Sequence, residues 1–411
     1  MKSLKLTRIK IPRLKRKIPK PVIEALELLH SKHYVAWLAG GCVRDLLLRR
    51  TPKDWDIVTD APVEVQQRLF VNHLEVGKAF GILKLPPQSG VSIDVGYFRK
   101  ESRYTDYRHP DAVEVGTVDT DCQRRDFTIN ALYYDYLKGD VIDGVSGVKD
   151  LINKRIRAVG DPSIRFNEDA LRILRAARFQ AQLGFRISKR TQSAMVLQGH
   201  LLSHISRERI REEVFKALNT PRAFEFLKYC WQLKIWPIIF GPTNQIPRFR
   251  KSFKSINLKL KLTPALWWIA SLQLAGLIDN PKEILRLSSA EEQFCRQIQD
   301  FLKACTLRTS HRLPEFFIHW QRENPGALDF VLATTISLSP KPNSFVLDDA
   351  YIGIQRLKRF EKIEPSNNFN WIKSQDLINQ GILPGPQLGK ALAQANWERF
   401  WNFRFSKVKS S

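Results

Sequence analysis

Apolar residues follow two different spacings along the chain. From residue 35 to about residue 142, short β-rich runs are separated by turn residues and helical stretches, and these runs cover residues 55–59, 81–85, 91–98 and 128–135. From about residue 167 onward, apolar residues recur at helical spacing with almost no strand pattern. The two spacings predict an α+β fold, in which an N-terminal head with a small mixed β-sheet is followed by all-helical domains.

Proline-rich sequence and changes of charge add further boundaries. Residues 339–344 combine prolines with small polar residues, which is typical of a linker. We therefore predict five segments: a basic arm (1–20), a head (21–160), a helical neck (161–220), a helical body (221–340) and a helical tail (341–411).

The net charge narrows the kinds of partner. The 411 residues include 66 Lys and Arg against 41 Asp and Glu, a formal net charge of +25, which exceeds what solubility requires. We therefore expect a polyanionic partner. No membrane span is expected, because the most apolar stretch, residues 262–278, contains Pro264, Ser271 and Gln273. The five cysteines lack any paired spacing, so we expect no disulfide framework, no zinc site and a cytoplasmic location.

The first twenty residues carry nine Lys or Arg and no acidic residue, and Pro12 and Pro19 interrupt them. No apolar core of a signal peptide follows this segment. It is either a solvated terminus or an arm that contacts a polyanion. The sequence leaves both interpretations open.

Asp54 and Asp56 form a candidate metal site. They stand two residues apart in a strand-like run, so both side chains project from one face while Trp55 and Ile57 project from the other. Mg²⁺ prefers oxygen ligands and is commonly held by a few carboxylates together with substrate phosphates. Such pairs are also common on protein surfaces, so the interpretation needs a second motif.

A glycine pair upstream supplies that motif. Gly40 and Gly41 precede a helical run that contains Arg44, and a glycine turn in this place lets the backbone approach phosphate groups. Taken alone, the turn is better explained by packing. Together, residues 40–59 resemble the signature of the polymerase β-type nucleotidyltransferase superfamily, specifically its class II branch of tRNA nucleotidyltransferases and bacterial poly(A) polymerases. Arg49 departs from the pattern, because a glycine commonly stands there.

The resemblance implies further site residues in the head. Asp94 lies where the family usually has a third carboxylate, although Gly96 and Tyr97 replace the small hydroxyl residues that usually follow. Residues 124–132 resemble the family's motif for the ribose of the incoming nucleotide, and the alternative is a salt-bridged strand edge. The resemblance thus implies sugar or phosphate contacts for Arg125, Asp126 and Asn130.

The neck carries the residues implied to choose the base. Asn167 is expected to cap a helix on which Asp169 and Arg172 share one face. By themselves these two would be an ordinary ion pair on a helix. They resemble the family's protein template, in which Asp accepts from the exocyclic amine of C or A and Arg donates to the ring acceptor. The resemblance assigns Arg175 and Arg178 to nucleotide binding as well.

Three stretches outside the catalytic centre complete the pattern. Residues 143–151 resemble the family's hinge between head and neck, although a plain turn explains their glycines equally well. Residues 376–392 resemble the tail of bacterial tRNA nucleotidyltransferases. The body has no acidic residue from 226 to 278 and contains a candidate phosphate track of Arg248, Arg250, Lys251, Lys254, Lys259 and Lys261.

The resemblance implies an enzyme that adds C and A to the tRNA 3′ end from CTP and ATP by two-metal phosphoryl transfer. Mg²⁺ is the expected cofactor, tRNA the expected partner, and no obligate protein partner is expected. Three alternatives stay open: a poly(A) polymerase, an A-adding enzyme of a split pair, and a non-catalytic RNA-binding protein. Residues 99–121 retain the loop associated with adding the terminal A, which disfavours a CC-only enzyme. The intact carboxylates disfavour the non-catalytic alternative.

Overall fold

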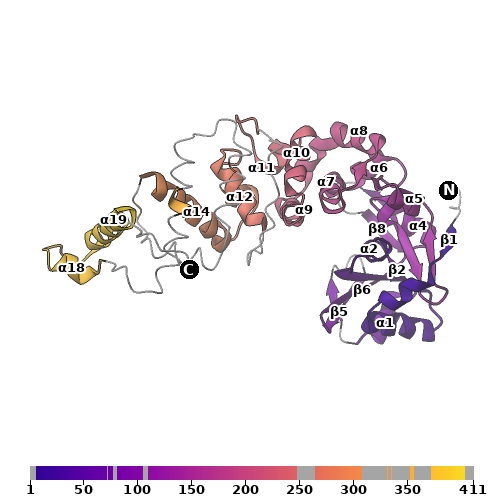
Figure 1. The fold of residues 1–411 in the computed structure, drawn as a ribbon. Helices are drawn as coiled ribbons and strands as arrows, with labels where there is room; N and C mark the ends of the chain where they lie inside the picture. Colours follow the sequence, from indigo (N-terminus) through magenta and orange to yellow (C-terminus); the bar gives the residue numbers. More distant parts are fainter. Residues whose placement is uncertain are drawn as a thin grey trace, which may run out of the picture. The chain divides into compact units, whose positions relative to one another are not determined.

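Two compact units divide the chain, one of residues 1–209 with 232–235 and one of residues 210–231 with 236–411. The computed structural model describes residues 6–71, 73–76, 81–104, 110–247, 264–307, 331, 335, 352–355 and 372–402. The first unit contains the large β-sheet, and the described part of the second unit consists of helices and their connections (Figure 1).

An eight-stranded sheet organises the first unit, in the order β1-β10-β9-β2-β3-β6-β5-β4. β3 and β6 run parallel, and the other neighbouring strands run antiparallel. The predicted head with a mixed sheet is therefore confirmed. The strands are β1 (Thr7–Lys10), β2 (Ala36–Ala39), β3 (Asp54–Thr59), β4 (Leu74–Val76), β5 (Ile82–Gln88), β6 (Val91–Tyr97), β9 (Leu132–Asp135) and β10 (Asp140–Asp143).

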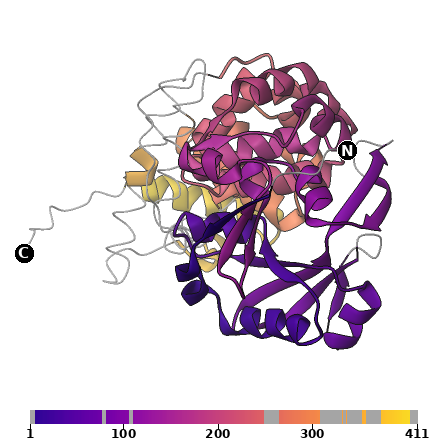
Figure 2. The ribbon, with the colours of Figure 1, turned by 90° about the vertical axis from the view of Figure 1, so that its right-hand side faces the viewer.

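The two faces of the sheet pack differently. Leu38 and Ile57 point into the larger core, to which α1 (Lys20–Ser31) contributes its apolar face. The indigo α1 lies beside the sheet in both views (Figures 1 and 2). Trp37 and Val58, the next residues along β2 and β3, join a smaller cluster on the opposite face. This alternation is the period-two pattern of a strand that is packed on both sides.

Residues 7–18 belong to the head in the structure, whereas the sequence predicted a separate basic arm of residues 1–20. β1 pairs with β10, and η1 (Pro12–Lys17) follows it. Leu14 and Ile18 are 4% and 6% exposed and join the larger core. The difference arises because apolar residues alternate with the cations, so that the apolar side chains are buried while the charged groups stay at the surface.

Short helices and a second sheet complete the head. They are α2 (Gly41–Leu47), α3 (Val63–Leu69), β7 (Arg99–Tyr104), β8 (Pro110–Val115), α4 (Val118–Arg124), η3 (Thr128–Asn130) and α5 (Gly147–Ile152). The strand predicted over residues 128–135 begins only at Leu132. Its first part is the helical turn η3, because the Thr128 N–H donates to the carbonyl of Arg157, at 2.9 Å, outside the sheet.

The neck is helical, as predicted. Its elements are β11 (Arg155–Ile156), α6 (Pro162–Glu168), α7 (Leu171–Leu183), β12 (Arg186–Ile187), α8 (Lys189–Gln198), η4 (Gly199–His204) and α9 (Arg207–Leu218). α7 is buried on most sides and ends at Gly184, which takes the left-handed conformation typical of a helix end (φ 72°).

The described part of body and tail is also helical. It contains α10 (Ala223–Gln232), α11 (Trp236–Phe240), α12 (Pro264–Leu274), α13 (Pro281–Ile284), α14 (Ser289–Leu307), α18 (Ser374–Ile378) and α19 (Pro386–Asn402). The fully buried Trp267 packs edge-on against Phe294, with ring centres 4.7 Å apart. No helix in the described ranges is long and apolar enough to cross a membrane. The predicted phosphate track and the linker at 339–344 lie outside the described residues.

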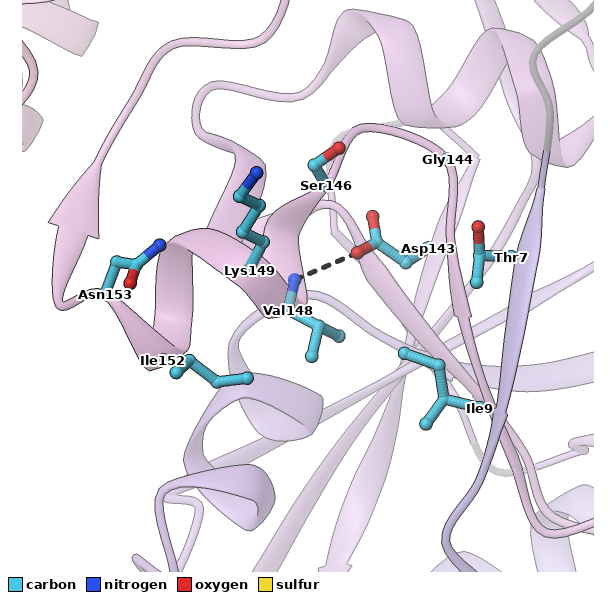
Figure 3. A pocket seen from close by; sticks show the side chains of 9 residues that line it. All are labelled: Thr7, Ile9, Asp143, Gly144, Ser146, Val148, Lys149, Ile152 and Asn153. Carbon is cyan, nitrogen blue, oxygen red and sulfur yellow. Dashed lines mark hydrogen bonds between the residues drawn. The ribbon is translucent and has the colours of Figure 1, made fainter.

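A close contact fixes the predicted hinge segment against the head. A Cβ atom on Gly147 would overlap the Thr128 carbonyl oxygen and lie 2.9 Å from its carbonyl carbon. The Asp143 carboxylate caps the same segment by accepting from the N–H groups of Val145, Gly147 and Val148 at 3.0, 2.9 and 2.9 Å. Figure 3 shows the bond from Val148. Only glycine permits α5 to lie this close to η3.

Gly147→Ala is expected to lower the free energy of unfolding of the head by about 1–3 kcal/mol, because the added methyl group overlaps backbone atoms. Gly96→Ala is the matched control, since a Cβ atom there would have its nearest neighbour 3.8 Å away, at Ile82. Its stability should change by less than about 1 kcal/mol. Denaturant unfolding of both variants measures the difference, and equal stabilities would contradict the close contact.

Candidate active site

Three carboxylates lie on one face of the sheet. Asp56 of β3 stands in register with Asp94 of the parallel β6, and Asp54 lies two residues before Asp56. Neighbours in register, and residues two apart along a strand, project to the same side, so the three share a face. Trp55 and Ile57 are 2% and 1% exposed and anchor β3 in the core on the other face. The structure thus brings the predicted ligands together on one face.

The three carboxylates repel one another. The pKa of Asp56 is raised to about 6, chiefly by burial. The guanidinium groups of Arg125 and Arg44 oppose this rise, and the charges of Asp94 and Asp54 contribute to it. Burial and the charge of Asp54 raise the pKa of Asp94 as well. A divalent cation placed among these groups would turn the repulsion into attraction.

Asp94 fits the role of a cation ligand. Its Oδ1 atom is buried and has no hydrogen-bond partner, and a polar atom in that situation costs free energy. Among the residues that the structure describes, no three acidic, histidine or cysteine side chains are closed up around one point as metal ligands are. The fit to a cation therefore rests on the shared face, the raised pKa values and this unpartnered oxygen.

The glycine turn lies beside the carboxylates. Gly40 has φ 74° and ψ −128°, a conformation that residues with side chains rarely adopt. A Cβ atom on Gly40 would lie 2.7 Å from Arg125 Nη1 and 3.7 Å from Asp56 Oδ2. Backbone conformation and space therefore both require glycine. The turn brings the start of α2, where backbone N–H groups are free to meet phosphate oxygens, next to Asp56.

Hydrogen bonds join several of the predicted nucleotide-site residues into one network. Arg44 is 4% exposed and donates from Nη1 to Asn130 Oδ1 at 2.7 Å. Asn130 Nδ2 donates to Asp126 Oδ1 at 3.1 Å. Arg175 donates to Asp126 Oδ2 from Nε and Nη2, at 2.9 and 2.7 Å. The network connects α2, the predicted ribose motif and α7.

The ring of Phe179 contacts three of the predicted arginines, and no sequence motif identified Phe179 as a site residue. The guanidinium carbons of Arg44, Arg175 and Arg178 lie 5.2, 5.4 and 4.0 Å from the centre of its ring. These are cation–π distances. The ring is 4% exposed and packs edge-on against Phe127 at 5.8 Å. Helical spacing marks Phe179 only as a core residue, so its contact with the arginines emerges from the fold alone.

Asp121 positions Arg125 and was also missed. Its fully buried carboxylate accepts from Arg124 Nη2 at 2.6 Å, from Arg125 Nε at 3.1 Å and from the Tyr133 hydroxyl at 2.6 Å. Burial alone would raise the pKa of Asp121, but the guanidinium groups of Arg125 and Arg124 hold it well below its usual range. A helix predicted over residues 118–124 could have revealed this contact, because it places Asp121 one helical turn before Arg125.

The helix around the predicted base-reading pair begins later than expected. Asn167 lies inside α6, so it does not cap the helix that carries Arg172, and this prediction was wrong. Asp169 interrupts the helical path with an extended conformation (φ −144°, ψ 102°). Its own Oδ1 accepts from the Leu171 N–H at 3.1 Å, so Asp169 takes the capping role.

Asp169 and Arg172 each contact other residues. Asp169 Oδ2 lies 3.0 Å from Arg209 Nη2. Arg172 donates from Nη1 to Glu168 Oε2 at 2.8 Å and from Nη2 to the carbonyl oxygen of Arg124 at 3.0 Å. These contacts fix the direction of both side chains and join α7 to the end of α4.

A pocket of about 510 Å³ lies elsewhere on the head (Figure 3). It is bordered by β1 and the hinge segment, through Thr7, Ile9, Asp143, Gly144, Ser146, Val148, Lys149, Ile152 and Asn153. These lining residues, all in the described part of the head, do not include the carboxylates of β3 and β6. A search for the active site by concave shape alone would therefore have selected a different part of the head.

Comparisons with known proteins match both the head and the segment that follows it. Residues 36–157 match the family described as "Poly A polymerase head domain", and residues 184–245 match "Probable RNA and SrmB- binding site of polymerase A". The CCA-adding enzyme of Lactobacillus helveticus is 33% identical over 386 residues, which cover 92% of each chain. The CCA-adding enzyme of Bacillus pumilus is 39% identical over 271 residues, 65% of this chain and 66% of that one.

Solved structures match over nearly the whole chain. The crystal structure of the Bacillus stearothermophilus CCA-adding enzyme in complex with CTP has a TM-score of 0.62 at 26% identity and covers 95% of this chain and 93% of that chain. A Thermotoga maritima CCA-adding enzyme complexed with tRNA has a TM-score of 0.66 at 18% identity, covers 99% and 97% of the two chains, and shares the fold. Because a relative at 33% identity spans almost all of it, the chain belongs to the family of CCA-adding enzymes, which are nucleotidyltransferases.

Proposed function

We propose that the chain adds C and A nucleotides to the 3′ end of tRNA, taking them from CTP and ATP without a nucleic-acid template and releasing pyrophosphate. Its relatives are CCA-adding enzymes, and one of them is solved in complex with CTP. The observation that carries the proposal is the shared face of Asp54, Asp56 and Asp94 beside the turn at Gly40. Carboxylates next to a phosphate-binding turn suit metal-assisted phosphoryl transfer.

Asp54, Asp56 and Asp94 are the proposed ligands of Mg²⁺. This ion prefers oxygen ligands and shares them among a few carboxylates, water and substrate phosphates. When bound, two such ions would make the RNA 3′ hydroxyl more acidic and neutralise charge on the departing pyrophosphate. The chain supplies no covalent nucleophile in this scheme. Its own residues position the two substrates and hold the ligands in register.

The incoming nucleotide would lie between the turn and the ribose motif. The backbone N–H group of Gly41, at the start of α2, would bind its phosphates, and Arg125, held against Gly40, would balance their charge. Gly40 would contribute through its conformation, because its own N–H donates to the Leu132 carbonyl at 2.9 Å. Asn130 Oδ1 accepts from Arg44 and has room for a second bond from a ribose hydroxyl, which favours ribonucleotides. Asp126, whose oxygens accept from Phe127, Asn130 and Arg175, would orient Asn130.

The arginines around Phe179 act mainly as positioning residues in this proposal. Arg44 donates to Asp45 from Nε and Nη2 as well as to Asn130, so few of its donors are left for a ligand. Arg178 donates to Gln182 at 2.8 Å and stacks on the ring. Together with Arg175 they orient the ribose motif and add positive potential where the triphosphate binds.

Asp169 and Arg172 are proposed to select the base. C and A both offer an exocyclic amine to an Asp acceptor and a ring nitrogen to an Arg donor, whereas U and G offer a carbonyl or a ring N–H. A wrong base would leave buried polar groups unpaired, at about 1–3 kcal/mol each. Each oxygen of Asp169 accepts one bond within the protein, and a carboxylate oxygen has room for a second.

The full CCA activity is favoured over its alternatives. Residues 99–121, which include β7, β8 and the start of α4, retain the loop associated with adding the terminal A. The tail segment 376–392 resembles tRNA enzymes rather than poly(A) polymerases. We propose the cytoplasm as the compartment, because the described cysteines are buried free thiols, which suits a reducing environment.

Purified protein is expected to extend a tRNA transcript that lacks CCA by three nucleotides when CTP, ATP and Mg²⁺ are present. Asp54→Ala should abolish the extension and leave tRNA binding nearly unchanged, because the exposed Asp54 serves the metals rather than the fold. Denaturing gels of labelled tRNA resolve the products.

Other product patterns would reject the proposal in identifiable ways. Long A tails would identify a poly(A) polymerase, and a single A added only to tRNA ending in CC would identify an A-adding enzyme. Activity of Asp54→Ala within about tenfold of the wild type would show that the metal site is misplaced.

Asp169→Ala is expected to reduce the discrimination against UTP by about 1–3 kcal/mol, because the acceptor for the exocyclic amine is lost. Arg209→Ala is the matched control, since it removes the same ion pair and leaves the Asp169 carboxylate in place. Its discrimination should remain close to that of the wild type. Steady-state kcat/KM for CTP, ATP and UTP measures the effect. Equal discrimination in the two variants would show that Asp169 acts only through its structural ion pair with Arg209.

A further inference from the structure

A second pocket, of about 300 Å³, lies at the end of α2 opposite to the glycine turn. It is formed by η1 and the C-terminal end of α2, and its lining combines four apolar residues with three cations: Ile11, Leu14, Leu46, Leu47, Arg13, Lys17 and Arg49. The seven-residue α2 separates it from Gly40 and Gly41 by roughly 10 Å. We call these residues the cationic pocket.

The three cations of the cationic pocket have no acidic partner among the residues that the structure describes. Within the described ranges, Arg13, Lys17 and Arg49 make no side-chain hydrogen bond and no ion pair. Two cations of the preceding strand β1 are neutralised, since Arg8 and Lys10 lie 3.5 and 3.4 Å from carboxylates of β9 and β10. Acidic side chains of the sheet thus neutralise the positive charge of β1. No described acidic side chain neutralises the three cations of the cationic pocket.

Arg49 stands at a position where glycine would be easier to accommodate. Its φ of 59° is in the left-handed region, two residues beyond the end of α2. A residue with a side chain costs about 1 kcal/mol more than glycine in this conformation. Arg50 is the next residue, and its positive charge is enough to interact favourably with the negative C-terminal end of the α2 dipole. What Arg49 adds beyond a glycine is a guanidinium group at the pocket.

We propose that the cationic pocket binds backbone phosphates of the tRNA substrate and is a second RNA contact on the catalytic head. This inference rests on the proposed function, which makes RNA the polyanion that the enzyme must hold. Unpaired Lys and Arg supply salt-dependent affinity for phosphates without reading sequence. The apolar floor lets their aliphatic stems pack while the charged ends face outward. α2 connects this contact with the turn that meets the incoming nucleotide.

Arg49→Gly is the most informative single variant. It removes one cation and relieves the left-handed backbone, so its melting temperature should not fall substantially and a loss of RNA affinity reports on binding. The triple variant Arg13→Gln, Lys17→Gln, Arg49→Gly removes all three charges. Lys20→Gln is the matched control, because Lys20 is an exposed cation of the same region that pairs with Glu24 at 3.5 Å.

Fluorescence anisotropy with a labelled tRNA transcript, at several salt concentrations, measures the effect. Each lost phosphate contact should weaken binding about four- to fivefold near 0.15 M salt and reduce the salt slope by about 0.7–0.9. Lys20→Gln should bind like the wild type. Nucleotide addition by the wild type, measured on the same preparation, distinguishes a failure of the proposed function from a failure of this inference.

Two outcomes would overturn the inference. In the first, the triple variant binds tRNA with the affinity and salt slope of Lys20→Gln. In the second, calorimetry shows that pyrophosphate binds the wild type but not the triple variant, while both bind tRNA equally. The pocket would then take a small anion instead of RNA.

Discussion

The repulsion among Asp54, Asp56 and Asp94 is the interaction around which the head is arranged. Three like charges stay on one face because the opposite face of β3 and β6 is locked in the core, where Ile57 and Val95 are almost fully buried. A slip of one residue in either strand would turn its carboxylates inward, so hydrophobic burial fixes their register. The packing of one face thus maintains an unfavourable charge arrangement on the other.

Arginines reduce this repulsion without cancelling it. Arg125 lies near Asp56, yet Asp121 and Tyr133 hold its guanidinium in a fixed place, and Arg44 is held by its own partners. The pKa of Asp56 therefore remains raised, at about 6, despite two neighbouring cations. A mobile divalent ion can supply the missing charge and leave with the product, which a fixed arginine cannot do. Arg44 also contacts α7, through the ring of Phe179.

Local patterns predicted the parts of the site that depend on neighbours in sequence. Alternation along one strand was enough to place Asp56 on the same face as its partner two residues before it. The position of Asp94 needed the family resemblance, because the pairing of β3 with β6 is a tertiary contact. Asp121 and Phe179 were missed for the same reason: their partners come from distant segments. The prediction that Asn167 caps the helix was wrong because the carboxylate of Asp169, two residues later, takes the same capping role.

Melting of the wild type and of Asp56→Asn, with and without Mg²⁺, tests most directly whether the carboxylates form a cation site. The folded-state pKa of Asp56, about 6, exceeds its usual value of 3.8, so the wild type loses stability as pH rises through this interval. Without Mg²⁺, Asp56→Asn should therefore melt higher than the wild type at pH 8 but not at pH 4. Mg²⁺ should raise the melting temperature of the wild type at pH 8 and affect Asp56→Asn much less. Equal responses of both proteins to Mg²⁺ at pH 8 would contradict a cation site at these carboxylates.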